Sequence, residues 1–342
     1  MSDSVEVVRW SAEHEAAVDG FVAGHPEGLI YYTAAYRRYL LEIAGGECRS
    51  LVALAGGRVM GVLPLMLKDG PFGPVLNSLP FFGSYGGVLA ARADSEAALI
   101  AGYDREAAAA TVATWISHPF MDTATPRHDL TDERIAQWTM LPADGALPAG
   151  VEASARRNIQ KAQAAGVTVR ESPDALPFLE ATHRANLAGI GGRAKPAAFF
   201  SRLPAMTYGR DWRLYLAEQD GAPLAALLTF EAVKTVEYVM PVVVESARAL
   251  QPTAIILATA MADAARRGLT RWNWGGTWLT QEGVYRFKKK WGADERRYRY
   301  FIRLNDASLR RRSAEELSSG YPWYFTLPYD QLAPAERSQN GH

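Results

Sequence analysis

The densest group of residues suited to chemistry stands late in the chain, where glycines, aromatic rings and cations alternate. A strand-like run ends at Gly275-Gly276, and a helix-like run over 283–292 follows it. Adjacent glycines leave two peptide N–H groups free to face a ligand, and α/β proteins bind ligands at the carboxyl ends of their strands. The helix carries the cations Arg286, Lys288, Lys289 and Lys290.

These cations are interleaved with Tyr285, Phe287 and Trp291. At least one lysine must therefore lie beside apolar surface, where loss of solvent makes it a stronger partner for a developing oxyanion or a phosphate. The alternative is a solvated basic helix end, where lysines favour the negative end of the helix dipole. We expect the functional role.

A second basic group lies in the segment 154–162. Arg157 and Lys161 are one helical turn apart, Arg156 adjoins them, and Ser154 can cap the helix. An anion approaching this end would meet cations, free N–H groups and the positive end of the helix dipole. Phosphate or substrate binding is one interpretation, and an ordinary surface helix with extended Arg and Lys side chains is the other.

The segment 79–89 mixes aromatic residues with glycines, which brings backbone close to a partner. We predict that an anionic acceptor lies between two domains, near Ser84, Tyr85 and Gly86 and near the basic residue Arg37 or Arg38, with the aromatic ring available for sugar stacking. A tight turn packed on the core is the alternative.

Several function classes are disfavoured by composition. Lys plus Arg and Asp plus Glu number 37 each, so the whole chain offers no attraction to nucleic acid or to an anionic membrane. The six histidines show no metal-ligand spacing, and Cys48 is the sole cysteine, so we predict no metal and no disulfide. The first ten residues lack the apolar core of a signal peptide, and no apolar run approaches a membrane span. A cytoplasmic location is expected.

Hydrophobic periodicity predicts an α/β protein in which one order of elements occurs twice. The first half reads as helices at 12–23, 33–44 and 95–116, a hairpin of 49–55 and 58–67 turned by Gly56-Gly57, and a short strand near 121. A Pro/Gly-rich stretch at 141–150 is the predicted linker. The second half reads as helices at 153–165, 174–187, 195–207 and 253–267, and strands at 167–171, 212–218, 223–231, 234–244 and 270–274. We favour duplication over a coincidence of α/β patterns.

The motifs now resemble those of a known family. Residues 154–167 read Ser-x-x-Arg-Asn-Ile-x-Lys-Ala-x-x-Ala-Gly-Val, and residues 283–292 read Gly-Val-Tyr-x-Phe-Lys-x-x-Trp-Gly. With the hairpin around Asp220-Gly221 between them, they are similar to the FemAB family, and to its FemX-like and BioF2-like members. The resemblance is specific over most of 150–304 and looser over 1–148.

The resemblance implies an α/β (α+β) fold of two tandem GNAT-like domains, with mixed sheets flanked by helices. We expect an N-terminal domain at 1–148, a C-terminal catalytic domain at 149–330 and a flexible tail at 331–342. The activity it implies is transfer of an acyl or aminoacyl group to a primary amine of a cell-envelope precursor, in peptidoglycan or exopolysaccharide synthesis. The acceptor would be a small molecule or a lipid- or nucleotide-linked glycan.

The same resemblance assigns roles to residues. Phe287 and Lys288 match a Phe-Lys pair near the reacting centre, while Arg156, Arg157 and Lys161 match a basic helix. We predict that Lys288 stabilises the oxyanion, assisted by the N–H groups of Gly275 and Gly276, with Tyr285 and Arg286 beside the donor. Glu245 and Tyr238 are candidates to relay the proton, and a buried structural pair is the alternative.

The donor remains open between acyl-CoA and aminoacyl-tRNA, used as a co-substrate and not as a permanently bound cofactor. The turn 245–252, where GNAT enzymes place a glycine-containing loop for coenzyme A, contains no glycine here, so backbone N–H groups are less able to cradle a pyrophosphate. A non-catalytic module on a duplicated GNAT fold, binding a glycan or a nucleotide, is the competing function.

Overall fold

The computed structural model describes residues 4–80, 85–329 and 332. These residues form two compact units. Unit 1 comprises the described residues of the ranges 1–27, 31–133 and 298–342, and unit 2 comprises residues 28–30 and 134–297. The predicted domain boundary at 148/149 thus falls inside unit 2, and the C-terminal part of the chain belongs to unit 1. The predicted tail at 331–342 lies outside the described residues apart from Leu332.

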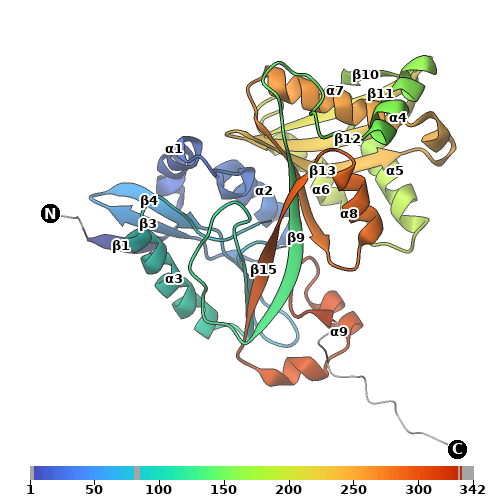
Figure 1. Ribbon diagram of the computed structural model, residues 1–342. Coiled ribbons are helices and arrows are strands. Elements are labelled where there is room, and N and C mark those ends of the chain that lie inside the picture. The colour runs from blue at the N-terminus through green and yellow to red at the C-terminus, as the bar shows by residue number, and fades with distance from the viewer. Residues whose placement is uncertain (1–3, 81–84, 330–331, 333–342) are drawn as a thin grey trace, which may run out of the picture. The chain divides into compact units, whose positions relative to one another are not determined.

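Unit 1 is built on a four-stranded antiparallel sheet in the order β1-β3-β4-β7. Helix α3 packs on one face of this sheet and α1 on the other (Figure 1). Leu99 and Tyr103 of α3 meet Leu51 and Leu63 of the sheet in the core. Its elements are β1 (Val5–Arg9), α1 (Glu15–Gly24), α2 (Ala34–Ala44), β2 (Glu47–Cys48), β3 (Leu51–Ala55), β4 (Arg58–Leu63), β5 (Met66–Lys68), β6 (Val75–Asn77), β7 (Leu89–Ala90), α3 (Ala93–Ala108), β8 (Val112–Ile116) and α9 (Ala314–Gly320).

Two strands run from one unit into the other along the chain. They are β9 (Leu130–Met140) and β15 (Asp294–Leu304). In unit 1, residues Tyr300 to Leu304 of β15 pair antiparallel with β8, and β8 pairs parallel with β6. In unit 2, residues Arg134 to Met140 of β9 pair antiparallel with β14.

Unit 2 holds a mixed sheet in the order β10-β11-β12-β13-β14-β9. Helix α7, with α4 beside it, covers one face, and α5 covers the other (Figure 1). The core joins Leu227 and Trp272 of the sheet to Ile256 and Leu257 of α7. Its elements are α4 (Ala153–Ala164), β10 (Thr168–Glu171), α5 (Leu176–Ala188), α6 (Ala197–Ser201), β11 (Trp212–Gln219), β12 (Ala222–Ala232), β13 (Thr235–Val243), the 3₁₀ helix η5 (Glu245–Leu250), α7 (Pro252–Arg266), β14 (Arg271–Trp278) and α8 (Glu282–Lys289).

Both predicted glycine-turned hairpins are confirmed. Ala55 faces Arg58 across Gly56-Gly57, and Gln219 faces Ala222 across Asp220-Gly221. Each turn residue has a positive φ, from 52° to 78°, which is the geometry of a tight two-residue hairpin turn. These turns fix the register, so the side chains of each hairpin alternate correctly between the two faces of the sheet.

Two predicted elements of the first half are wrong, and one strand near the C-terminal end was missed. Helix α3 ends at Ala108, and the rest of the predicted helix 95–116 contains the strand β8. The five residues of β8 are all buried and include Val112, Trp115 and Ile116, whose β-branched or aromatic side chains favour a strand. No strand forms near Met121. The strand β15, with Tyr298, Tyr300 and Ile302 turned to the interior by period-two alternation, was not predicted.

The predicted helix 195–207 is divided. Helix α6 covers Ala197–Ser201, and a separate 3₁₀ turn covers Leu203–Ala205 with Pro204 near its start. Proline cannot donate the next helical hydrogen bond, so the α-helix stops before it. Among the described residues, no helix has both the length and the apolar character needed to cross a membrane.

Candidate active site

The central feature of unit 2 is a point where two parallel strands separate. β13 and β14 pair only over Thr235–Glu237 and Arg271–Asn273. At the last paired position, the amide of Asn273 donates to Glu237 Oε2 at 2.8 Å, and Asn273 Oδ1 accepts from the N–H of Gly275 at 3.0 Å. The β14 register against β9 shifts between Asn273 and Gly275, where Gly275 has φ 72°. Such a bulge turns the end of a strand and re-aims its groups.

Lys288 reaches this bulge from α8 and is almost fully buried, with 4% of its surface exposed. Its Nζ donates to Thr277 Oγ1 at 2.7 Å and to the carbonyl oxygens of Gly275 and Gly276, both at 3.3 Å. A lysine ammonium has three protons, and three acceptors surround it here. The cation is therefore held at the end of β14 by groups of that strand.

A hydrogen-bonded chain holds this arrangement in place. Thr277 Oγ1 donates to Gln137 Oε1 at 2.9 Å, and Gln137 Nε2 donates to the carbonyl oxygen of Tyr285 at 3.3 Å. Thr277 and Gln137 are both fully buried. The chain thus links β14, β9 and α8 around Lys288. Sequence reasoning did not select Thr277 or Gln137, because nothing local distinguishes a polar residue that ends up inside a sheet.

Burial lowers the pKa of the Lys288 ammonium to about 7. The physical cause is loss of solvation of the charged form, which buried lysines suffer unless a carboxylate compensates. Near neutral pH the amine can therefore exist in both protonation states. Perturbed groups of this kind are typical of functional sites.

Phe287, the residue before Lys288, belongs to an aromatic cluster. Phe287 is half-buried and lies edge-on to Trp274, with ring centres 6.1 Å apart. Tyr238 of β13 meets the same tryptophan edge-on at 5.0 Å, and burial raises the pKa of its hydroxyl. Trp291 lies 6.2 Å from Trp274. These ring contacts pack α8 onto β13 and β14.

The other residues predicted on β14 and α8 contribute backbone groups, in the case of the two glycines, or side chains that are exposed or half-buried. The N–H of Gly275 is used by Asn273, and the carbonyls of both glycines face Lys288. Tyr285 is half-buried, and the Glu295 carboxylate raises the pKa of its hydroxyl. Arg286 is exposed and pairs with Glu282 one turn away, at 2.7 Å.

Glu245 lies apart from Lys288 in sequence and secondary structure, in η5 after β13. Its side chain is 81% exposed and pairs with Arg248 at 2.6 Å. Both residues line a cavity of about 750 Å³, together with Thr182 and Asn186 of α5. The remaining lining is mostly apolar or glycine: Ala181, Ala185, Gly189, Ile190 and Val244.

The basic residues of α4 divide into two kinds. Arg156 donates to the carbonyl oxygens of Val151 and Pro148, at 3.0 and 3.1 Å, so its guanidinium closes the backbone before the helix. Arg157 and Lys161 are exposed, and no ion pair is formed by either with the residues that the structure describes. Only these last two present free cations to an anion.

Of the residues predicted in the first half, Ser84 lies outside the described residues, and Arg37, Tyr85 and Gly86 lie in unit 1. Arg37 pairs with Glu15 at 2.5 Å and stacks over Trp10 at 4.9 Å. Tyr85 is fully buried, with its ring edge-on to Tyr298 at 5.1 Å. A Cβ on Gly86 would lie 2.6 Å from that of Leu79, so this backbone is tightly packed. A fully buried ring has no free face for a sugar, which agrees with the alternative of a turn packed on the core.

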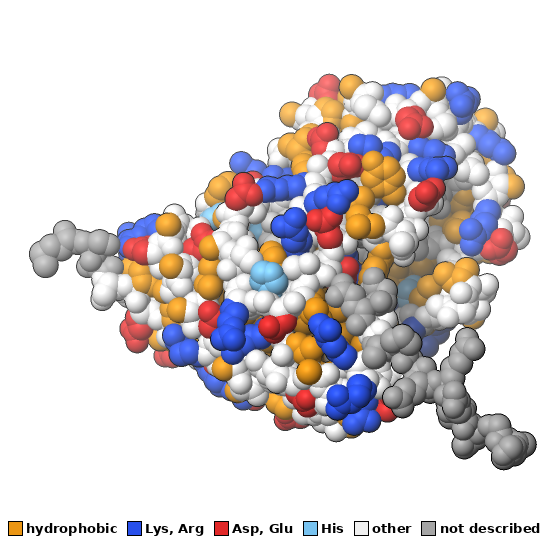
Figure 2. Space-filling view, turned by 60° about the horizontal axis from the view of Figure 1, so that its bottom comes forward, with side chains coloured by type: hydrophobic (Ala, Val, Ile, Leu, Met, Phe, Trp, Pro, Cys, Tyr) orange, Lys and Arg blue, Asp and Glu red, His pale blue; other side chains and the backbone are white. Residues whose placement is uncertain are grey.

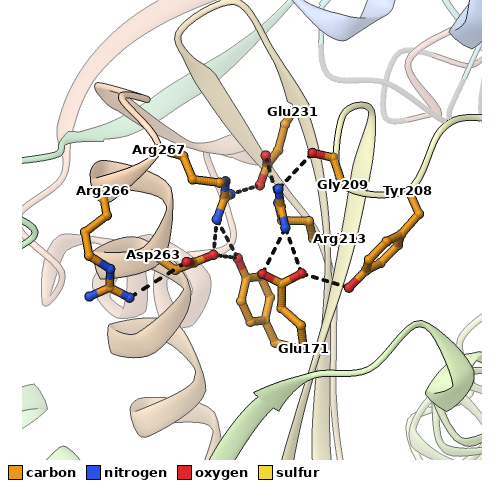
Figure 3. A network of polar contacts seen from close by, with 9 residues as sticks. Glu171, Tyr208, Gly209, Arg213, Glu231, Asp263, Arg266 and Arg267 are labelled. Atoms are coloured by element: carbon orange, nitrogen blue, oxygen red, sulfur yellow. Dashed lines mark hydrogen bonds and ion pairs between the residues drawn. The ribbon is translucent and has the colours of Figure 1, made fainter.

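Figure 3 shows a second polar cluster in unit 2, between the sheet and α7. Arg213 lies between Glu171 and Glu231, with shortest N–O distances of 2.7 and 3.3 Å, and Arg267 joins Glu231, at 2.5 Å, to Asp263. The positive and negative side chains pair with one another. This cluster therefore crosslinks β10, β11, β12 and α7 and is a structural feature.

One face of the molecule carries both positive and negative side chains. On the face shown in Figure 2, Lys and Arg side chains are interspersed with Asp and Glu, as the equal totals of 37 lead one to expect. Among the described residues, no group of three His, Cys, Asp or Glu side chains could hold a metal ion.

Comparison with known proteins defines the class. Residues 150–289 match the family model "Acetyltransferase (GNAT) domain", so this part of the chain is a GNAT domain. The matched range includes Lys288 and its acceptors on β14. No curated protein matches the sequence.

Several solved structures have a similar fold over most of the chain. FemX has 17% sequence identity and a TM-score of 0.68, over 88% of this chain and 98% of FemX. A conserved protein of unknown function from Bacteroides thetaiotaomicron has 10% identity and a TM-score of 0.58, over 88% and 99%. The C-terminal domain of a provisionally named lysylphosphatidylglycerol synthetase from Agrobacterium fabrum has 12% identity and a TM-score of 0.54, over 87% and 93%. The chain thus shares the fold of FemX, and the predicted fold class, two GNAT-like domains with mixed sheets flanked by helices, is confirmed.

Proposed function

We propose that the protein is an N-acyltransferase that moves an acyl or aminoacyl group to a primary amine of a cell-envelope precursor. The observation that carries this proposal is Lys288, a buried cation held at the end of β14 beside the separation of β13 and β14. The GNAT domain match and the FemX fold support acyl transfer as the reaction class.

The reaction makes one bond and breaks one. The acceptor amine attacks the donor carbonyl, a C–N bond forms, and the carbonyl oxygen takes up negative charge. Collapse of this intermediate breaks the C–O or C–S bond to the carrier, and the proton lost by the amine ends on the leaving group. An enzyme accelerates these steps by orienting the reactants and stabilising the oxyanion.

Lys288 is suited to the second task. Its two bonds to the carbonyls of Gly275 and Gly276 are long, at 3.3 Å, and Gly276 is exposed. A substrate oxyanion arriving on the side of Gly276 can replace one of these bonds while Thr277 keeps hold of the ammonium. Because Lys288 is buried from solvent, the charge acts there with little screening by water.

The proposed acceptor and location are supported by two solved structures of similar fold. FemX and the lysylphosphatidylglycerol synthetase domain share this fold, and the name of the second refers to a lipid that carries an amino acid. We infer an acceptor that is a lipid- or nucleotide-linked glycan or peptide on the cytoplasmic side, with Arg157 and Lys161 as its anion contacts.

A matrix of donors and acceptors tests this function. Charged tRNA and acyl-CoA thioesters are each incubated with nucleotide-linked amino sugars and peptidoglycan precursors, and products are detected by mass spectrometry. The expected result is a mass increase of one acyl or aminoacyl group on an acceptor amine. Saturable binding of a glycan or nucleotide without product from any pair would instead establish the non-catalytic binding module.

A further inference from the structure

The separation of β13 from β14 leaves a free strand edge in unit 2. β13 pairs with β12 as far as Val243, but with β14 only over Thr235–Glu237. From Tyr238 to Val243, the side of β13 that is turned away from β12 therefore has no strand partner among the residues that the structure describes. A free edge of this kind is a template for any extended chain that carries amide groups.

Of the two positions on that edge nearest the end of the strand, one is capped and the other cannot donate a hydrogen bond. The N–H of Val244 donates to Leu224 of β12, at 2.8 Å, so Val243 turns its own backbone groups away from β12. Asn186 of α5 takes both of them: its Nδ2 donates to the Val243 carbonyl at 2.9 Å, and its Oδ1 accepts the Val243 N–H at 3.1 Å.

The next position facing the same way is Pro241, by the alternation of an antiparallel ladder. Proline has no N–H to donate. One position is thus capped by a side-chain amide that imitates a neighbouring strand, and the other has no donor. An extended ligand cannot find the alternating donors and acceptors that a strand edge normally offers.

Coenzyme A is the acyl carrier that such an edge would suit. Its pantetheine arm is an extended chain with two amide groups, and it can add to a strand edge as a peptide does. The turn after β13 is equally unsuited to its phosphates. η5 has no glycine, it places the Glu245 carboxylate at its start, and α7 begins at Pro252, which lacks an N–H.

We propose that Asn186 is a donor-selectivity residue, which closes the β13 edge and excludes acyl donors carried on a pantetheine arm. This proposal rests on the acyl transfer proposed above and narrows its donor to an acyl group held as an ester on a carrier without such an arm. Asn186 also forms part of the wall of the 750 Å³ cavity between α5 and η5. A shorter side chain at this position connects the cavity to the strand edge.

Binding of coenzyme A and acetyl-CoA to the full-length protein tests the proposal without any need for turnover. Titration calorimetry compares the wild type with Asn186→Ala and with Thr182→Ala, a control that enlarges the same cavity without uncovering the edge. We expect no saturable binding by the wild type or the control up to roughly 1 mM, and at least tenfold tighter binding by Asn186→Ala. Asn186→Ser, too short to span both Val243 groups, serves as a second variant if the Ala protein folds poorly.

Hydrogen exchange supplies a second readout at the atom concerned. The Val243 amide should exchange slowly in the wild type, faster in Asn186→Ala, and slowly again when that variant is saturated with coenzyme A. Micromolar binding of coenzyme A by the wild type, or equal binding by Asn186→Ala and the wild type, would overturn the proposal. Failure of the proposed function would appear separately, as absence of product from every donor with the wild type.

Discussion

At the scale of single residues, the rate of the proposed acyl transfer depends on Lys288. A cation preorganised at a developing oxyanion in a water-poor site contributes about 3 kcal/mol to the transition state. Lys288→Ala should therefore lower kcat by ~10²-fold or more while the protein stays folded. Lys289→Ala is the matched control, because Lys289 is half-exposed and bonds to the Ala293 carbonyl and to Glu295. Single-turnover rates and thermal midpoints are measured for both; equal, small rate losses would show that Lys288 is not catalytic.

The lowered pKa of Lys288 also predicts how stability depends on pH. Between about 7 and the ordinary lysine value of 10.5, the unfolded chain holds this proton and the folded chain does not. The unfolded state thus binds more protons, so this residue makes the wild type more stable as pH rises through that window, by about 1 kcal/mol per pH unit. Below pH 7 the penalty is constant.

Lys288→Met removes this contribution. The free energy of unfolding of the variant, relative to the wild type, should be highest near pH 7 and fall as pH rises to 9.5. Urea unfolding at a series of pH values measures the difference, with the exposed Lys290→Met as the control. Parallel stability curves for wild type and Lys288→Met would contradict the lowered pKa.

At the scale of elements, the cluster of Figure 3 joins helix α7 to three strands. Glu231 is buried and has two arginine partners, so Arg213→Met leaves buried carboxylates with less compensation. We expect a loss of about 3 kcal/mol in the free energy of unfolding, measured by urea denaturation. Arg184→Met breaks an exposed pair on α5 and should cost no more than ~0.5 kcal/mol. Similar losses in the two variants would mean that the cluster does not stabilise the sheet.

At the scale of the whole molecule, the two units are linked by strands that pass from one to the other. The predicted boundary at 148/149 cuts β9 away from β14, to which it is paired from Arg134 to Met140. It also removes Gln137 from the chain of hydrogen bonds around Lys288.

A fragment of residues 134–297 should therefore unfold cooperatively, whereas a fragment of residues 149–330 should aggregate or lack a thermal transition. Circular dichroism during heating and size-exclusion chromatography compare them. Cooperative unfolding of the 149–330 fragment would show that β9 is dispensable and that the sequence-based boundary is adequate.

The sequence by itself determined the local features. The Gly-Gly and Asp-Gly pairs set both hairpins, helix periodicity located α2, α4 and α7, and the alternation of cations with aromatic rings singled out the helix of Lys288. Each of these follows from interactions within a few residues, which is why the pattern predicts them. Periodicity also predicted the α/β class, and the resemblance of the two motifs to the FemAB family implied the GNAT-like fold.

Only the tertiary structure decided which groups meet. Thr277 and Gln137 are 140 positions apart, and Asn186 reaches a strand 57 positions away, so no local pattern contains either contact. Burial of Tyr85 and the antiparallel pairing of β9 with β14 depend on the same long-range packing. The sequence specifies which chemical groups are present. Their loss of solvent and their hydrogen-bond partners depend on distant segments that the folded chain brings together.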